Sequence, residues 1–424
     1  MAHFVTQQWE LPRQRIGRGR TRTCEFQAFV PAPLVGRSFA FSEECAADIA
    51  RAEKSIRALE AGSGALSPGK PLARLLLRAE ASASSSTEGL EANVGRLMRA
   101  ELAGDFENPG TRDLEAEEVL ADIDAMMDAM LWASSQSRIT HLTLLQVHER
   151  IMRMSPLRPY AGRVRTSPSW IGGQTSNPCF ASFVPPPHKE VPRLLSDVAQ
   201  FCNDKSLPAV AQAALVHAQF ETIHPFVDGN GRTGRALIHV LFQRRGLVSC
   251  WCPPVALVLG TWPRRYALGL DAFHLAGEPD SPEVQAGVNA WVSFFARACS
   301  RAVKDTTLFE MRVREIQAEW LKRLTPLPGD PLVYRFIQTL PSLVVTTVER
   351  AARYVGTSPS QAEGAMQKLV KARVLKEVRV SKRNRVFEAT DLVAAFTQFE
   401  RRLASPAGDT RVASPIRPVP RRQR

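Results

Sequence analysis

Apolar residues recur at helical spacing through most of the chain, and this pattern predicts an all-α fold. Between residues 210 and 222, for example, Val210, Ala214, Leu215 and Ala218 fall on one face of a helix. A further helix is expected to start near Glu190. The other stretches predicted to be helical are 42–60, 72–81, 114–132, 143–154, 236–245, 262–273 and 282–324.

After a boundary rich in proline at 326–331, the pattern changes to short helices followed by two strands. Ser358 is suited to cap the third of these helices, with Pro359 at its first position. The order is typical of a winged helix, which can bind DNA through its third helix and a basic wing but in many proteins contacts only other proteins. The helices are predicted at 332–338, 347–354 and 360–372, and the strands at 374–380 and 386–388.

The net charge of +13 is concentrated in this last part of the chain. From Asp330 to Arg424 there are 18 Lys and Arg residues against 8 Asp and Glu residues, a balance of +10. Such an excess of positive charge favours contact with phosphate groups. DNA is therefore a candidate partner of the winged helix, and a protein partner stays open beside it.

Composition indicates a soluble globular protein of two or three domains, with 424 residues, 44% apolar and 23% charged. No apolar run is long enough to span a membrane, and the segment around Arg13–Arg20 lacks the apolar stretch of a secretory signal. The seven cysteines are scattered and odd in number, which argues against a disulfide framework, and Cys250 and Cys252 alone are too few for zinc. We therefore expect a cytoplasmic protein with no membrane partner.

One stretch, HPFVDGNGRTGR at 224–235, combines groups that serve phosphate chemistry. Its glycines let a ligand approach the backbone, and the helix predicted after it would favour an anion at its N-terminus. Asp228 is an oxygen ligand of the kind Mg²⁺ takes, and His224 is a base near neutral pH. Arg232 and Arg235 can hold phosphate oxygens. The combination predicts phosphoryl or nucleotidyl transfer; the alternative is a connector whose charges simply face water.

This stretch resembles the signature of the Fic family, H-x-F-x-(D/E)-G-N-G-R-x-x-R, with no mismatch. The resemblance extends upstream through residues 217–223 and covers most of the chain up to about residue 300. It implies a Fic-type helical core with a small β-hairpin flap. It also implies a protein adenylyltransferase, which moves AMP from ATP to a Ser, Thr or Tyr hydroxyl of a target protein.

The resemblance also assigns roles to individual residues. His224 would be the catalytic base, Asp228 would hold Mg²⁺, and Phe226 would be buried and anchor the loop. Tyr266 would lie near the nucleobase, although the second Tyr that many relatives carry beside it is absent and a buried structural Tyr is the alternative. His148, by contrast, is interpreted as structural. The nucleotide-binding residues are then Gly229, Asn230, Gly231, Arg232, Gly234, Arg235 and Tyr266.

A second stretch matches the inhibitory pattern of the family, (S/T)-x-x-x-E-(G/N), through Ser84, Glu88 and Gly89. The resemblance implies that Glu88 pairs with Arg235 and so keeps that arginine from the ATP γ-phosphate. On composition alone the same residues fit a helix end rich in hydroxyl groups.

The stretch 162–173 resembles the Fic flap, a hairpin beside the active loop, and Gly172 and Gly173 fit its tip. An exposed strand edge can hold a target peptide through backbone hydrogen bonds. An ordinary surface hairpin is the alternative.

These features divide the chain into six predicted parts. They are a basic N-terminal arm (1–40), a helical region with the inhibitory motif (41–135), the Fic catalytic core (136–305), a linker helix (306–328), the winged-helix domain (329–400) and a disordered basic tail (401–424).

Other functions stay open at this point. A minority of Fic relatives perform kinase or phosphocholine chemistry or remove AMP, but Gly231, where a kinase-type relative has Lys, favours the ordinary orientation of ATP. A DNA-binding transcriptional regulator that senses a nucleotide through a Fic-like domain is a further candidate, although a sensor has no need of His224. The sequence also leaves open whether the chain forms a homodimer.

Overall fold

The computed structural model describes residues 1–10, 23–62, 72, 75–76, 79–80, 94–103, 113–173, 177–249, 253–324, 330–379 and 385–416. Ser84 and Glu88 lie outside these residues, so the inhibitory motif stays a prediction. The chain divides into two compact units. The first comprises Met1–Glu53, Ala125–Gly246 and Arg264–Arg297, and the second comprises Lys54–Asp124, Leu247–Pro263 and Ala298–Arg424.

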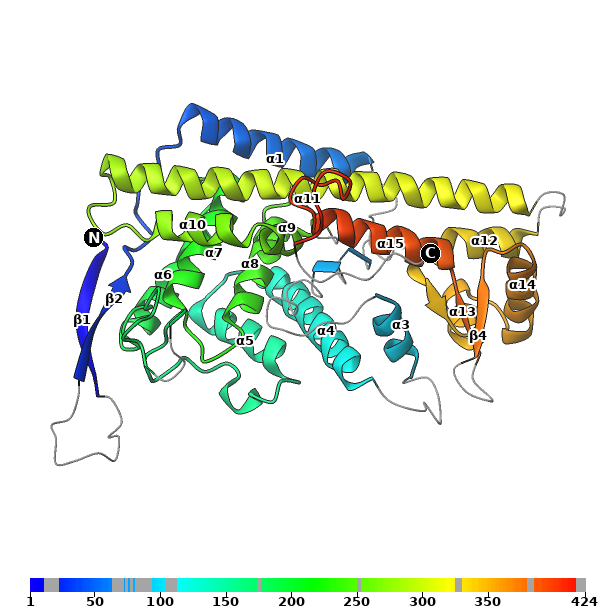
Figure 1. Cartoon of the computed structure of the whole chain (residues 1–424), viewed down its shortest axis with the longest axis horizontal. Coiled ribbons are helices and arrows are strands. Elements are labelled where there is room, and N and C mark those ends of the chain that lie inside the picture. The colour runs from blue at the N-terminus through cyan, green and yellow to red at the C-terminus, as the bar shows by residue number, and fades with distance from the viewer. Residues whose placement is uncertain are drawn as a thin grey trace. The chain divides into compact units, whose positions relative to one another are not determined.

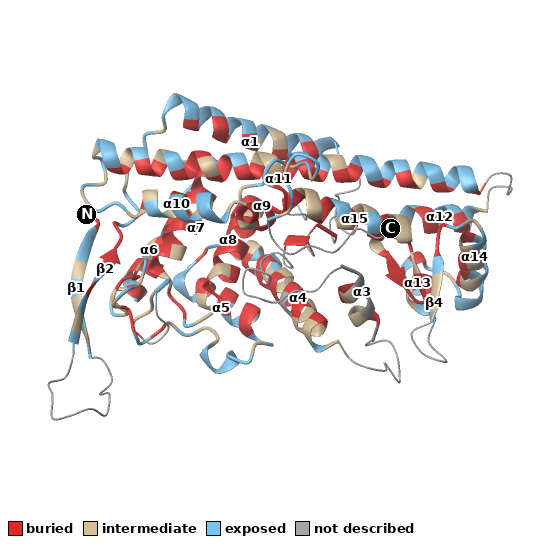
Figure 2. Cartoon of the chain, viewed as in Figure 1, coloured by how far each residue is buried: buried red, intermediate tan, exposed pale blue. Residues whose placement is uncertain are grey.

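The first unit is built on two helices, α7 (Ala209–Ile223) and α8 (Asn230–Arg244), which pack against each other (Figure 1). Almost every residue of α7 is buried, because its apolar residues are distributed around the whole helix (Figure 2). Two further helices pack around this pair. Helix α5 (His141–Met152) contacts α8, and helix α6 (Val191–Phe201) contacts α7. The unit also contains α10 (Pro263–Phe273) and parts of α1 (Glu43–Gly62), α4 (Leu114–Ser135) and α11 (Pro282–Arg323).

The N-terminal residues, expected to be an arm with little periodicity, contain two paired strands. β1 (His3–Glu10) and β2 (Thr23–Val30) are antiparallel, with His3 opposite Val30 and Glu10 opposite Thr23. The pattern was missed because the exposed face of β1 is mostly polar and its other face is only half-buried, so the alternation is weak. A 2.9 Å hydrogen bond from the N–H of Phe29 to the carbonyl of Val184 joins β2 to the segment 177–184.

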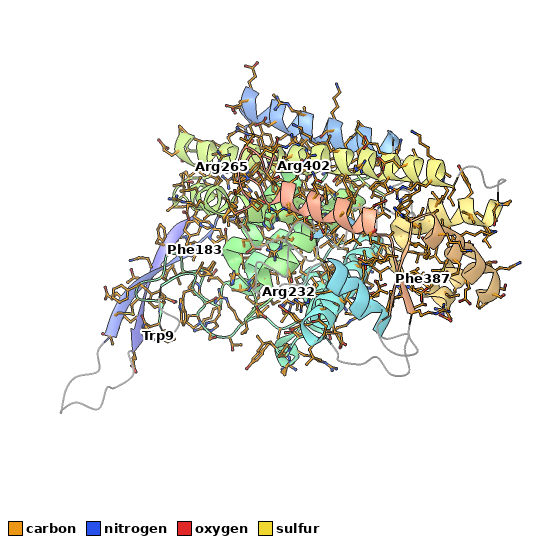
Figure 3. The ribbon with its side chains drawn as sticks, turned by 45° about the vertical axis from the view of Figure 1, so that its right-hand side comes forward. Trp9, Phe183, Arg232, Arg265, Phe387 and Arg402 are labelled. Atoms are coloured by element: carbon orange, nitrogen blue, oxygen red, sulfur yellow. A yellow bond between two sulfur atoms is a disulfide. The ribbon has the colours of Figure 1, made fainter. Side chains whose placement is uncertain are left out.

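A disulfide between Cys24 and Cys179 links the same two segments, so the expectation drawn from the scattered cysteines does not hold for this pair. The Cα atoms are 5.9 Å apart, within the range that a disulfide requires. Trp9 packs edge-on against Trp170, with ring centroids 5.5 Å apart. Phe183 is packed against the cluster of Ala2, Phe29 and Ala32. Figure 3 labels Trp9 and Phe183 beside the strands β1 and β2. Sequence spacing carries no sign of a pairing across 155 residues.

The predicted flap hairpin is reduced to one contact in the described residues 162–173 and 177–184. This contact is the isolated bridge between Ile171 and Phe183, with no regular strand on either side. Pro168 removes a backbone donor from the segment before the bridge. Gly172 and Gly173 both have positive φ, 74° and 72°, which is a turn conformation and agrees with their expected place at a tip.

The second unit contains helices and a three-stranded antiparallel sheet of order β3–β5–β4. The predicted helix–turn–helix elements are present: Ser358 caps α14, and Gly356 ends α13 in the left-handed conformation. Three helices of this unit, α3, α9 and α15, were not predicted. The elements are α3 (Val94–Ala103), α9 (Val255–Thr261), α12 (Pro331–Thr339), β3 (Val345–Thr346), α13 (Val348–Val355), α14 (Pro359–Lys371), β4 (Lys376–Arg379), β5 (Arg385–Glu388) and α15 (Thr390–Leu403). The mostly helical fold expected from the sequence is confirmed, and the described residues contain two small antiparallel sheets.

Residues 405–416 belong to this unit and are ordered by hydrogen bonds, where a disordered tail was predicted. The hydroxyl of Ser405 donates to the carbonyl of Ala413 over 2.7 Å, and the N–H of Ile416 donates to the carbonyl of Ala404 over 3.1 Å. Backbone bonding of this kind needs no large apolar residue, so composition could not reveal it.

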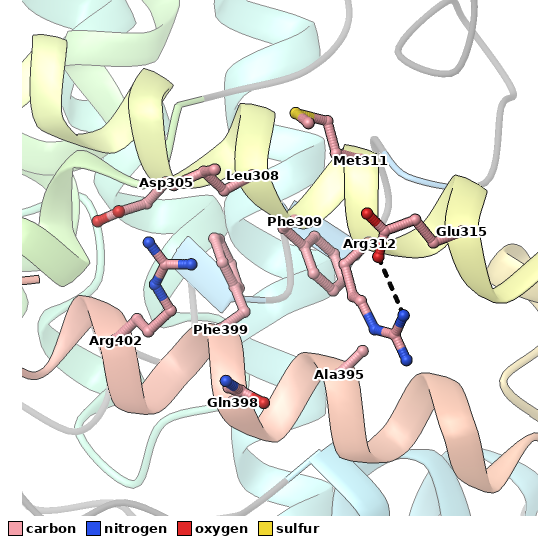
Figure 4. A pocket seen from close by; sticks show the side chains of 10 residues that line it. All are labelled: Asp305, Leu308, Phe309, Met311, Arg312, Glu315, Ala395, Gln398, Phe399 and Arg402. Atoms are coloured by element: carbon pink, nitrogen blue, oxygen red, sulfur yellow. Dashed lines mark hydrogen bonds and ion pairs between the residues drawn. The ribbon is translucent and has the colours of Figure 1, made fainter. Parts of the chain in front are cut away.

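A pocket of about 300 Å³ lies between α11 and α15 in the second unit (Figure 4). Phe309 and Phe399 stack in it with centroids 4.6 Å apart, and Arg312 pairs with Glu315 at its rim. None of the site residues predicted from the sequence lines this pocket. Across the described residues, no helix combines the length and the apolar character needed to cross a membrane.

Candidate active site

The stretch at 224–235 is a short loop that runs into the first turns of α8. α7 ends at Ile223, and His224 follows in the left-handed conformation with φ of 47°. Gly229 is the N-cap of α8 and is also left-handed, with φ of 73°. Arg232 and Arg235 are therefore residues of α8, which begins earlier than the sequence predicted. The first N–H groups of a helix have no acceptor within it, so this N-terminus can bind an anion.

Asn230 fixes the shape of the loop with its side-chain amide. Its Oδ1 accepts a hydrogen bond from the N–H of Phe226, and its Nδ2 donates to the carbonyl of Phe226, each over 2.9 Å. The Phe226 side chain is fully buried, as the sequence predicted. The Asn230 side chain is thus occupied in bracing the loop, and only its backbone N–H is directed to a ligand by the helix geometry.

The side chain of His148, in α5, packs against the loop and supports it. Its ring stacks on Phe226 with centroids 3.6 Å apart. Its Nδ1 accepts from the N–H of Gly162 over 2.9 Å, so Nε2 carries the proton and donates to the carbonyl of Asp228 over 3.0 Å. Burial lowers the pKa of His148 to about 4. These contacts agree with the structural role expected for it; its place on the buried face of a predicted helix was the only sequence signal.

Arg165 also supports the loop, a role that the sequence pattern did not indicate. Its side chain is buried and donates to the carbonyl of His224 through Nε over 2.8 Å, to Ser167 through Nη1 over 3.0 Å and to Pro186 through Nη2 over 2.6 Å. Its own N–H donates to the carbonyl of Pro225 over 2.9 Å. Burial lowers its pKa to about 10, so it stays charged at neutral pH. One arginine therefore fastens the loop to the two ends of the segment 167–186.

His224 is half-buried, and its backbone carbonyl accepts a hydrogen bond from Arg165. Burial, followed by the nearby positive charge of Arg165, lowers the pKa of its imidazole to about 4. The ring is consequently neutral at neutral pH and able to accept a proton. This is the protonation state that a general base requires.

Asp228 and Arg232 lie together at the start of α8. Arg232 Nη2 is 3.4 Å from Asp228 Oδ2; the arginine side chain is 8% exposed and the aspartate side chain 40% exposed. Figure 3 labels Arg232 at this position. Among the described residues no group of three or more His, Cys, Asp or Glu side chains could hold a metal. A single accessible carboxylate still fits Mg²⁺, which commonly takes one carboxylate, substrate phosphates and water.

Arg235 lies against the first turn of its own helix. A Cβ added at Gly231 would come within 2.8 Å of Arg235 Nη1, so the guanidinium covers that glycine. Gly234 is needed for close packing, since a Cβ there would meet Glu221 Oε1 of α7 at 2.6 Å. The predicted phosphate residues Gly229, Asn230, Gly231, Arg232, Gly234 and Arg235 are thus brought together with His224 and Asp228.

The hydroxyl group of Tyr266, in α10, points into the helical core. The oxygen is 3.0 Å from Nε2 of His217, and burial raises the pKa of the phenol well above its ordinary value. Its ring is 5.9 Å from that of Trp291. These contacts are those of the structural alternative considered for Tyr266, and its contact with a nucleobase stays a prediction.

The fold and this loop define a Fic-type protein. Residues 138–242 match the Fic/DOC family and residues 46–131 match the Fic/DOC family N-terminal region. Over these residues the chain matches the Fic/DOC family, and it is related in sequence to protein adenylyltransferases.

Two curated relatives and one solved structure illustrate the relationship. The chain is 30% identical over 186 residues to the protein adenylyltransferase fic-1 of Caenorhabditis elegans, covering 42% of this chain and 33% of that protein. It is 28% identical over 244 residues to the protein adenylyltransferase Fic of Drosophila ananassae, covering 55% of this chain and 46% of that protein. The match thus spans less than half of each relative. A crystal structure of a Fic family protein from Desulfovibrio desulfuricans G20 superposes with a TM-score of 0.51 at 18% identity, covering 83% of this chain and 97% of that one.

The protonation of His224 can be measured directly. We expect its ring to titrate with a midpoint of about 4, because burial and the charge of Arg165 disfavour the imidazolium. Nuclear magnetic resonance of the ring Cε1 proton, assigned by comparison with His224→Ala, gives the midpoint. A midpoint near the ordinary value of 6.5 would contradict this description.

The left-handed turn before α8 predicts a large effect of Gly229→Ala. The new Cβ would strain the backbone and meet Met152 Sδ at 2.6 Å, so we expect the free energy of unfolding to fall by about 2–4 kcal/mol. Gly246→Ala is the matched control: its φ is +62° and no atom lies within 4 Å, so only about 1–2 kcal/mol should be lost. Equal losses in urea unfolding would show that contact with Met152 does not matter.

Proposed function

We propose that the protein transfers AMP from ATP to a Ser, Thr or Tyr hydroxyl of a target protein. One observation supports this reaction: half-buried His224 lies in the same short loop as the N-terminus of α8, which carries Arg232 and Arg235. A base beside an anion site is the arrangement that attack of a hydroxyl on a phosphate ester requires. The relationship to protein adenylyltransferases supports AMP as the group transferred.

In this reaction the backbone N–H groups at 229–231 hold the α- and β-phosphates of ATP. His224 accepts the proton of the incoming hydroxyl as its oxygen attacks the α-phosphorus. The bond from the α-phosphorus to the bridging oxygen breaks, and pyrophosphate leaves. Arg232 balances charge on the leaving side and Arg235 holds the γ-phosphate. Asp228 is the residue that would hold Mg²⁺, whose charge offsets that of the phosphates when it is bound.

Autoinhibition is part of the proposal. Glu88 of the motif that includes Ser84 occupies Arg235, so that the γ-phosphate cannot bind until the glutamate is displaced. Removing the carboxylate by Glu88→Gly should therefore release activity.

The role of His224 is tested in the Glu88→Gly protein. Adding His224→Ala should lower transfer of label from α-labelled ATP by about 10²–10⁴-fold, the usual contribution of a positioned base. ATP affinity by calorimetry should be unchanged, because the ring carries no phosphate contact in the proposal. His141→Ala, at an exposed position, is the control. Equal loss of transfer and of affinity would count against His224 as the base.

A second candidate function, DNA binding, is favoured by the order of elements in the C-terminal part of the second unit. The helix–turn–helix of α13 and α14 is followed by the antiparallel pair β4 and β5, as in a winged helix. Lys371 and Arg373 are exposed at the end of α14. Removing such cations weakens non-specific DNA binding and flattens its salt dependence.

Fluorescence anisotropy with a random-sequence duplex tests this second function. We expect Lys371→Ala/Arg373→Ala to weaken binding and to reduce the slope of log affinity against log salt by about 2. Lys54→Ala/Lys304→Ala, in other parts of the second unit, should leave the slope unchanged. If the wild-type chain shows no salt-dependent binding, DNA binding by the C-terminal part is excluded.

A further inference from the structure

Cys24 of β2 and Cys179 of the segment 177–184 form a disulfide between two half-buried residues. Disulfides that solvent reaches are the ones that thiols reduce most easily, because the attacking thiolate must contact a sulfur atom. The other cysteines that the structure describes have buried thiols. Burial raises the pKa of Cys45 to about 11 and that of Cys202 to about 12, so these thiols are poor nucleophiles. Among the described residues, Cys24 and Cys179 are therefore the pair open to thiol chemistry.

The segment 177–184 is held at its Val184 end without the help of sulfur. The N–H of Phe29 in β2 donates to the carbonyl of Val184 over 2.9 Å. Val184 is buried in a cluster with Phe26 and Ala28 of the same strand. This end of the segment is thus attached to β2 by a backbone hydrogen bond and by apolar packing, neither of which needs the disulfide.

The Cys179 end of the segment is attached to β2 through the disulfide. Local hydrogen bonds shape this end: the N–H of Cys179 donates to Oδ1 of Asn177, and the N–H of Ala181 donates to the carbonyl of Pro178, each over 3.1 Å. Bonds of this kind shape a turn but do not fix its position relative to a neighbouring strand. Opening the S–S bond therefore removes a covalent constraint from residues 177–181.

The segment leads directly into a contact of the active loop. The carbonyl of Pro186, two residues after the segment, accepts a hydrogen bond from Arg165 Nη2 over 2.6 Å, and Arg165 Nε donates to the carbonyl of His224 over 2.8 Å. Phe180, next to Cys179, is 74% exposed. Aromatic side chains are enriched where proteins contact each other. The disulfide thus fixes an exposed aromatic group on the stretch of chain that the loop-supporting arginine holds.

We propose that Cys24 and Cys179 form a reversible thiol–disulfide site, whose oxidation state sets how firmly the segment 177–184 is held. The chemical partner is a dithiol reductant. Its thiolate attacks one sulfur, so that the S–S bond breaks and a mixed disulfide forms. Its second thiol then attacks the mixed disulfide. The dithiol is oxidised to a cyclic disulfide, and the cysteine pair gains two electrons and two protons.

The site goes beyond the proposed function, but its consequence for a target protein rests on that function. A segment that is already ordered loses less conformational entropy when a target contacts Phe180, so the oxidised form should modify targets better. ATP, in the proposed reaction, is bound by groups at the start of α8, which lie outside the segment. Reduction should therefore lower transfer to protein without lowering the affinity for ATP.

Amide hydrogen exchange tests the site in the wild-type chain without an assay of activity. We expect dithiothreitol to speed exchange at the amides of Cys179 and Ala181 by at least about fivefold, the lower end of typical coupling between sites. The Arg165 amide, which donates to the carbonyl of Pro225, is the internal control and should not change. Alkylation of the reduced, folded chain should label Cys24 and Cys179 and leave the buried thiols unlabelled.

Two variants show whether this cysteine pair causes the response. Cys24→Ser/Cys179→Ser should exchange fast at Ala181 with or without dithiothreitol. Cys250→Ser/Cys252→Ser, a matched removal of two other cysteines, should respond to dithiothreitol as the wild type does. Three results would each overturn the inference: no labelling of the pair after dithiothreitol, unchanged exchange after full reduction, or a response that survives in Cys24→Ser/Cys179→Ser.

Transfer of label from α-labelled ATP to the Glu88→Gly protein itself tests the consequence for targets. Reduction should lower transfer by at least about fivefold, with ATP affinity by calorimetry unchanged. If exchange responds to reduction but transfer does not, the segment takes no part in the use of targets and this consequence is wrong. If neither redox state transfers label, the proposed function fails, whereas the exchange result still supports the thiol–disulfide site.

Discussion

Hydrogen bonds from buried side chains to backbone carbonyls hold the loop at 224–229, and the candidate site depends on them. His148 donates to the carbonyl of Asp228, Arg165 to that of His224, and Asn230 to that of Phe226. Each donor is buried, where an unpaired polar group is costly, so the loop has one well-defined shape. In the proposed reaction ATP is bound by other groups, namely the backbone N–H groups at the start of α8 and the side chains of Arg232 and Arg235.

The environments of the individual groups make the site compatible with phosphate chemistry at neutral pH. Burial keeps the His224 ring neutral. The Asp228 carboxylate stays accessible to solvent, and the start of α8 supplies backbone N–H groups. The arginines follow on the same helix, so their spacing relative to the N–H groups is set by helix geometry. Charge and base are positioned before any ligand binds, which lowers the cost of reorganisation.

Much of this could be predicted from the sequence, because helical periodicity and the spacing of the loop residues are local properties. The helices around the loop, burial of Phe226 and the convergence of His224, Asp228 and Arg232 follow from such patterns. What could not be predicted depends on contacts between distant residues. Arg165 bonds across 59 residues to His224, and Cys24 pairs with Cys179 across 155, with no trace in local spacing. The start of α8 inside the motif was also missed, because its glycines read as loop.

Whether the chain moves AMP is tested by the position of the label in ATP. The Glu88→Gly protein is incubated with magnesium and either α-labelled or γ-labelled ATP. We predict that label reaches protein only from the α position, because attack on the α-phosphorus releases the β- and γ-phosphates together. Label from the γ position would mean kinase chemistry, and no label from either position would contradict transfer from ATP.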